Sequence, residues 1–80
     1  MQAVKGKNMN REIAKEISEL MLNYGAKLDQ SVALVIENCS EEEIVKYRRT
    51  IGIIMGTMLL DIMNPIYKEH PDLKPKELSI

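Results

Sequence analysis

The stretch SEEEIVKYRRTIGIIMGTMLLDIMNPIYK, from Ser40 to Lys68, has the clearest helical pattern in the chain. Its first four residues have the pattern of a capping box. In that motif the Ser40 hydroxyl accepts a hydrogen bond from the Glu43 amide, and the Glu43 carboxylate accepts one from the Ser40 amide. Three consecutive glutamates also suit the positive end of a helix dipole. The pattern therefore predicts a long helix that begins at Glu41.

This helix is expected to run to about Met63, where Asn64-Pro65 should end or kink it. Proline lacks a backbone N–H and disfavours helix at the residue before it. Two further prolines follow in residues 69–80, which predict an extended tail. Whether Leu73 and Leu78 anchor that tail on the helices stays open.

Apolar residues cover roughly two thirds of the circumference of this helix on a helical wheel. The narrow polar stripe consists of Lys46, Arg49, Thr50, Thr57, Asp61, Asn64 and Lys68, with Ile53 and Leu60 intruding. One neighbouring helix covers only about 100° of such a surface, so this helix needs at least two packing partners. The first part of the chain supplies one partner, and a second copy of the chain would supply the other.

Residues 10–39 are expected to form the first arm of an α-helical hairpin. Asn10 should cap it, and an apolar stripe follows at helical spacing, made of Ile13, Ile17, Leu20 and Tyr24. Gly25 permits two interpretations. It could end a first helix, or it could lie within one continuous helix at a cost of about 1 kcal/mol. The sequence favours neither.

The chain has 80 residues, with no Phe and no Trp, and therefore a small core. Scaffolds of this size usually need a disulfide, a metal ion or self-association. One cysteine and one histidine can supply neither an internal disulfide nor a four-ligand zinc site, so self-association remains. We expect an all-α protein in which two helical hairpins form a four-helix-type bundle. Residues 10–68 would be its single domain, and residues 1–9 a disordered segment.

Two surfaces of the second helix are candidates for contacts between proteins. Gly52 and Gly56 are spaced so that two helices could cross closely, which suggests a dimer interface. That interface would consist of Arg48, Gly52, Met55, Gly56, Leu59 and Met63. Arg48 lies within the apolar sector, where it either extends to water or pairs with a carboxylate. The expected exposed surface for another partner consists of Lys46, Arg49, Ile53 and Leu60.

Catalysis and metal binding have little support in the sequence. Cys39 has no neighbouring histidine and is expected to be a small buried apolar residue. His70, between Glu69 and Pro71, makes a poor metal site. We therefore expect no catalytic residues, no cofactor and no metal. The most apolar stretch, Ile51 to Leu60, is shorter than the roughly 20 residues of a membrane span.

These observations favour a non-enzymatic cytoplasmic homodimer that acts through protein–protein contacts, as an adaptor, an inhibitor or a regulator. A narrower form of this hypothesis is a protein that neutralises a toxin or an enzyme. An alternative is an RNA-binding helical dimer. The net charge of −1, from 11 basic and 12 acidic residues, disfavours nucleic acid as the main partner. A share in the active site of an enzyme is the least favoured class.

Overall fold

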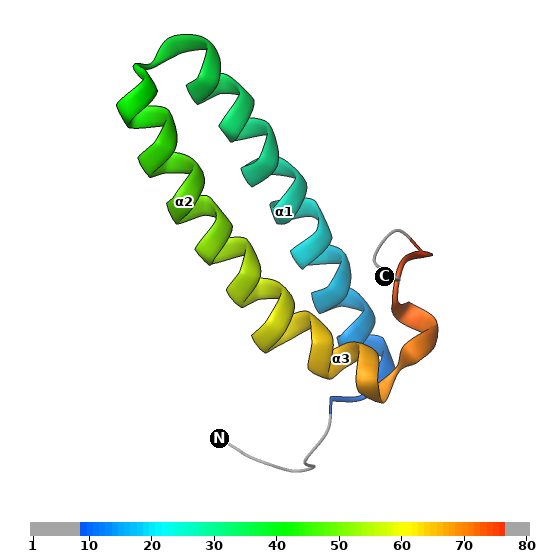
Figure 1. The fold of residues 1–80 in the computed structure, drawn as a ribbon. Coiled ribbons are helices and arrows are strands. Elements are labelled where there is room, and N and C mark those ends of the chain that lie inside the picture. Colours follow the sequence, from blue (N-terminus) through cyan, green and yellow to red (C-terminus); the bar gives the residue numbers. More distant parts are fainter. Residues whose placement is uncertain (1–8, 77–80) are drawn as a thin grey trace, which may run out of the picture.

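The protein forms an antiparallel helical hairpin in a computed structural model that describes residues 9–76 (Figure 1). Helix α1 (Arg11–Asn38) is the first arm. The second arm is one continuous helix, made of α2 (Glu41–Thr57), the π-helical turn η1 (Met58–Met63) and α3 (Asn64–Glu69). A 3-10 turn, η2 (Pro71–Leu73), follows it. The described residues contain helices and no strand, which confirms the all-α class.

Helix α1 is a single helix that passes through Gly25 without a break, which answers the question that the sequence left open. The Asn10 side chain caps it by accepting from the Ile13 amide at 2.9 Å. The residues of α1 that face α2 recur at spacings that alternate between four and three. They are Ala14, Ser18, Met21, Gly25, Leu28, Val32 and Val35. That spacing keeps one face on a neighbouring helix, which favours continuity over a break at Gly25.

The connection between the arms contains only Cys39 and Ser40. The predicted capping box is present: the Ser40 hydroxyl accepts from the Glu43 amide at 3.2 Å, and the Glu43 carboxylate accepts from the Ser40 amide at 3.0 Å. Because so short a connection leaves the two helices no room to separate, it sets them side by side and antiparallel.

Pro65 does not end the second arm, because a wider turn accommodates it and the helix continues to Glu69. The Asn64 amide donates to the Leu59 carbonyl, five residues back, so the backbone is π-helical just before the proline. This widening inserts one extra residue and rotates everything after it. As a result Met63 is buried against α1, whereas Ile62 is exposed.

The core lies at the open end of the hairpin, away from the connection. Ala14, Met63, Ile66 and Tyr67 form a buried cluster. Ile17, Met21, Leu59 and Leu73 pack against it. The buried Ser18 hydroxyl and the Tyr67 hydroxyl are hydrogen-bonded at 2.6 Å, which joins the two arms. Nearer the connection, Ser31 and Tyr47 form a similar bond at 2.6 Å.

The segment after α3 folds back onto the start of α1 and is not wholly extended. Leu73 packs on the core, and Asp72 accepts hydrogen bonds from the Arg11 guanidinium. The His70 Nε2 lies 2.9 Å from the Met9 carbonyl oxygen. The bond from Arg11 lowers the pKa of the Asp72 carboxyl below its ordinary value of 3.8. Leu78 and residues 1–8 lie outside the described residues.

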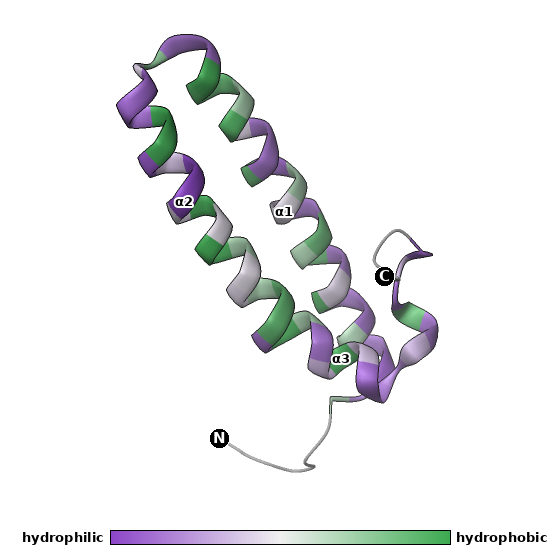
Figure 2. Cartoon of the chain, viewed as in Figure 1, coloured by the Kyte–Doolittle hydropathy of each residue, from purple (hydrophilic) through white to green (hydrophobic). Residues whose placement is uncertain are grey.

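The molecule is one layer thick, with principal extents of 48 × 31 × 17 Å. A helix with its side chains is about 10–12 Å across, so there is no room for a third helix above or below the pair. Each helix therefore buries only the side that faces the other arm. Apolar residues recur along both arms in Figure 2, and many of them lie away from the seam.

We predict that Gly25→Ala stabilises the protein by about 1 kcal/mol, since alanine removes the helix penalty of glycine. An added Cβ would lie 3.9 Å from the Met55 methyl carbon, an ordinary contact. Urea unfolding followed by circular dichroism measures the change. A loss of stability would show that the two arms pack more closely at this position than the structure indicates.

We predict that Tyr67→Phe lowers the free energy of unfolding by about 1 kcal/mol, because it removes the partner of the buried Ser18 hydroxyl. Tyr47→Phe is the matched control. The Ser31 hydroxyl keeps its bond to the Leu28 carbonyl at 2.5 Å, so this variant should lose less. Equal losses in the two variants, measured by urea unfolding, would contradict this assignment.

Candidate protein-interaction surfaces

The hairpin presents two flanks, because side-by-side helices leave solvent on both sides of their seam. We call the first the Tyr24 flank. It consists of Ile13, Leu20 and Tyr24 on α1 with Ile54, Met58 and Ile62 on the second arm. A shallow groove of about 380 Å³ joins its two halves, with Met21, Tyr24, Lys27 and Leu28 on one side and Met58 on the other. The flank is therefore shared by both arms.

The Tyr24 flank corrects the interpretation of the first apolar stripe. Ile13, Leu20 and Tyr24 have the spacing of a core stripe, yet all three are exposed, and only Ile17 of that set packs on the core. The seam uses smaller side chains at this end, namely Ala14 and Ser18. The alternating spacing of four and three through Ala14, Ser18 and Gly25 was the signal that could have identified the seam.

A second groove, of about 290 Å³, lies farther along the same flank, at the open end of the hairpin. It is lined by Met9, Asp61, Ile62, Pro65, Ile66, Glu69 and His70. The Tyr24 flank thus has an acidic rim at the open end, from Asp61 and Glu69. Near its middle it has a basic rim, from Lys27.

The opposite side is the Gly52 flank, which consists of Leu22 and Ile36 on α1 with Val45, Gly52 and Gly56 on α2. Leu22 follows Leu20 by two residues, and Gly52 precedes Ile54 by two. Because each step turns a helix by about 100°, both lie opposite the Tyr24 flank. A Cβ built on Gly52 or Gly56 meets no atom within 4 Å, so neither glycine is required by contacts within the chain.

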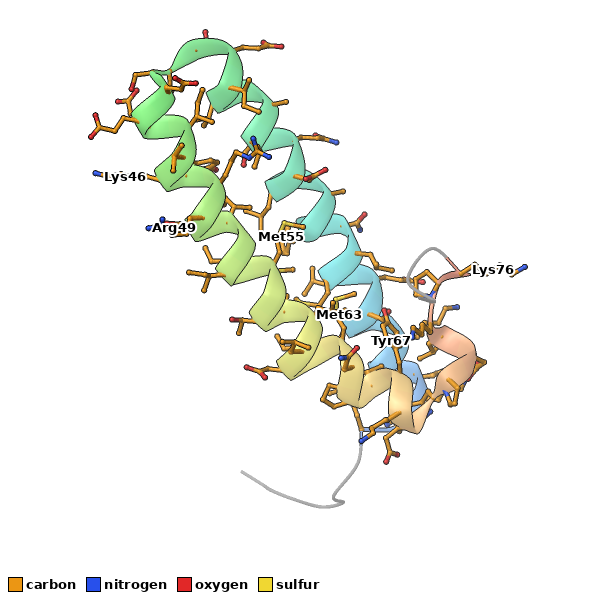
Figure 3. All side chains as sticks on the ribbon, in the orientation of Figure 1. Lys46, Arg49, Met55, Met63, Tyr67 and Lys76 are labelled. Atoms are coloured by element: carbon orange, nitrogen blue, oxygen red, sulfur yellow. The ribbon has the colours of Figure 1, made fainter. Side chains whose placement is uncertain are left out.

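Some of the residues expected at a dimer interface pack between the two arms, and the others lie at the surface. Met63 is 6% exposed in the core, and the Met55 methyl lies near Gly25, so these two side chains contact the other arm. Figure 3 places both between the helices. Leu59 is half-buried against the core cluster. Arg48 and Gly52 are exposed, and Gly56 is half-buried. Arg48 forms no ion pair with the other described residues.

The surface expected to meet another partner lies along the outer edge of the second arm. Lys46, Arg49, Ile53 and Leu60 are all exposed, and Figure 3 shows Lys46 and Arg49 directed away from α1. Near its far end is an open groove of about 670 Å³. That groove is lined by Leu60, Asn64, Pro65, Tyr67, Lys68, Pro71 and Lys74. The outer edge thus combines basic and apolar side chains.

Reactive and metal-binding groups are scattered over the described part of the chain. No three His, Cys, Asp or Glu residues among those described could hold one metal ion. Cys39 is exposed in the connection between the arms, which corrects the expectation that it is buried. Cys39 is the C-cap of α1, where the backbone becomes extended, so it no longer continues the helical face that packs on α2. The His70 Nε2 is within hydrogen-bonding distance of the Met9 carbonyl oxygen.

Because the second arm is one continuous helix, its apolar segment is longer than the stretch Ile51 to Leu60 considered from the sequence. Because the helix passes through Pro65, it spans Glu41–Glu69, 29 residues, and its most apolar part has a mean hydropathy of 1.3. That length and composition would suffice to cross a membrane, in contrast to the short stretch considered from the sequence. A helix that packs against protein meets the same criteria. Only 22% of this apolar part is buried within the hairpin, so most of it is available to a partner.

We predict that Gly52→Ala and Gly56→Ala each stabilise the protein by about 1 kcal/mol and leave its oligomeric state unchanged. Alanine favours helix, and the space at both positions is open. Thermal unfolding and native mass provide the two measurements. A close helix crossing between copies at this flank would reverse the result, because the added methyl groups would separate the backbones.

Comparison with known proteins found no matching family model, no similar curated protein and no similar solved structure, so the function must be inferred from the surfaces of this chain.

Proposed function

We propose that this protein is a non-enzymatic homodimer that acts through protein–protein contacts. One observation carries the proposal: large apolar side chains are more often exposed than buried. Among the described residues, twelve large apolar side chains are exposed, whereas the buried apolar core contains five residues. Soluble monomers rarely expose contiguous apolar patches of more than a few hundred Å².

The energetics favour a second copy as the cover for one flank. Each Å² of apolar surface removed from water contributes about 25 cal/mol, and a two-helix hairpin removes little of it alone. A chain of this size is marginally stable without an additional source of stability. Pairing two hairpins would give each helix two neighbours in a four-helix bundle, the usual solution for amphipathic helices of this length.

The outer edge of the second arm would remain exposed in such a dimer, and we propose it as the surface for another protein. Lys46 and Arg49 supply positive charge. Ile53 and Leu60 supply apolar contact, and each of these two residues is more than 60% exposed. A partner with an acidic and apolar surface fits this combination. An adaptor, a regulator or an inhibitor of an enzyme or toxin would work in this way, in the cytoplasm.

Nucleic acid is a less favoured partner for the same edge. Asp61 and Asn64 interrupt the basic residues, and the chain has a net charge of −1. The exposed Tyr24 could stack on a base, but it lies on α1, whereas Lys46 and Arg49 lie on α2. Binding to RNA would need cations and stacking groups on one surface.

We predict a dimer in solution, with twice the mass of the chain, by sedimentation equilibrium from submicromolar to submillimolar concentration. Loss of apolar exposure on dimerisation supplies the free energy. A monomer across that whole range would show that the homodimer proposal is wrong.

A pull-down with the dimeric protein as bait should recover a stoichiometric partner, and Lys46→Glu with Arg49→Glu should abolish its capture.

A further inference from the structure

We propose that two copies join through the Tyr24 flank in an antiparallel arrangement, with Lys27 of each copy against Glu69 of the other. This inference rests on the homodimer proposed above and identifies which of the two flanks forms it. The sequence pointed to the opposite flank, through Gly52 and Gly56. The structure gives three reasons to prefer the Tyr24 flank: its apolar content, its symmetry and its charges.

The apolar content differs between the flanks. Five large apolar side chains are exposed on the Tyr24 flank: Ile13, Leu20, Tyr24, Ile54 and Ile62. Its central groove also presents Met21, Leu28 and Met58. Methionine and tyrosine are common in the centres of protein interfaces, and the flexible methionines adapt to a partner. The Gly52 flank exposes fewer large apolar side chains, and the exposed Arg48, four residues before Gly52, adds a charge on the same side of α2.

The size of this face is sufficient for a stable dimer. A typical interface buries about 800 Å² on each partner. The broad face of the hairpin measures 48 × 31 Å. A two-fold axis at Leu20, about 15 Å from the open end, lets the two copies overlap over about 30 Å of that length, which leaves room for an interface of that size. The outer edge of the second arm is not needed for it, so both proposed surfaces can be used at once.

Two-fold symmetry fixes the arrangement. In a dimer with a two-fold axis, each residue on the axis meets its own copy. Leu20 lies midway between Ile13 and Lys27, seven residues from each. Seven residues of helix correspond to about 10 Å. An axis at Leu20 and perpendicular to α1 therefore places Lys27 of one copy at the level of Ile13 of the other.

The charges agree with this axis. The Ile13 end of the flank carries its acidic rim, because Glu69 lines the groove beside Met9 and His70. Lys27 lines the central groove. The antiparallel arrangement thus brings the basic rim of each copy to the level of the acidic rim of the other, once at each end. In a parallel arrangement like charges would face each other. Such pairs at the rim of an interface mainly select its register.

A matched pair of variants tests the flank. Leu20 and Leu22 are the same residue type on the same helix, 41% and 37% exposed, but on opposite flanks. Leu20→Glu places two like charges at the two-fold axis and should weaken the dimer at least 100-fold. Leu22→Glu should leave the dissociation constant within about threefold. Sedimentation equilibrium measures both, and circular dichroism confirms that each variant is helical.

Charge exchange tests the register without disturbing the apolar contacts. Lys27→Glu alone and Glu69→Lys alone should each weaken the dimer about tenfold. The two substitutions together should restore it to within about threefold of the original chain. Both side chains are exposed in the single hairpin, so neither substitution affects its folding.

The distance between spin labels on the Cys39 residues of the two copies tests whether the dimer is antiparallel. Cys39 is exposed and lies 19 residues beyond Leu20. In the antiparallel dimer two spin labels on Cys39 should therefore be about 55 Å apart, at 1.5 Å per residue. A parallel dimer would bring the connections together and give a distance below about 30 Å. Pulsed electron spin resonance distinguishes the two.

The outcomes separate this inference from the one on which it rests. A chain that is monomeric at all concentrations removes the homodimer and this interface with it. A dimer that survives Leu20→Glu but dissociates on Leu22→Glu keeps the homodimer and overturns the Tyr24 flank. A short distance between the Cys39 labels, or charge exchange without restoration, overturns the antiparallel register. Association with neutral phosphatidylcholine vesicles in place of a dimer would identify a lipid surface as the occupant and overturn the inference.

Discussion

The packing of only two helices against each other limits how much apolar surface this chain can bury. A helix with apolar residues around roughly two thirds of its circumference can bury only the side that faces its neighbour. The hairpin is 17 Å thick, so nothing within the described chain covers the remaining sides. Its core is correspondingly small, and apart from Ile51 it is confined to the open end, around Ala14, Met63, Ile66 and Tyr67. The apolar excess is therefore a direct consequence of the architecture.

Pro65 and the π-helical turn before it determine which apolar residues the hairpin uses for itself. A regular helix would clash at the proline, and the wider turn removes the clash while the helix continues. The accompanying rotation turns Met63 and Tyr67 toward α1 and Ile62 toward solvent. The hydrogen bond between Tyr67 and Ser18 then fixes that rotation. One proline thus contributes to the core and to the exposed Tyr24 flank at the same time.

The three exposed apolar surfaces differ in ways that suit different roles. The Tyr24 flank is broad and self-complementary in charge, which suits a second copy. The outer edge combines Lys46 and Arg49 with isolated apolar side chains, which suits a partner of different composition. The Gly52 flank has open space beside both glycines and exposes fewer large apolar side chains than the Tyr24 flank, so it offers a second copy less apolar surface to bury. The proposed dimer would therefore leave a separate surface of the chain exposed.

The sequence was sufficient to predict two helical arms and the position of the turn between them, because these depend on local interactions. The Asn10 cap and the capping box at Ser40 and Glu43 involve residues three apart, and they are present as predicted. Continuity through Gly25 could not be decided locally, since the small cost of glycine is offset only by packing against the other arm. The assignment of flanks also required the tertiary structure. Ile13, Leu20 and Tyr24 have the same spacing whether they face a core or solvent. Only the position of the second arm, rotated by the turn before Pro65, decides which residues are buried and which are left for a partner.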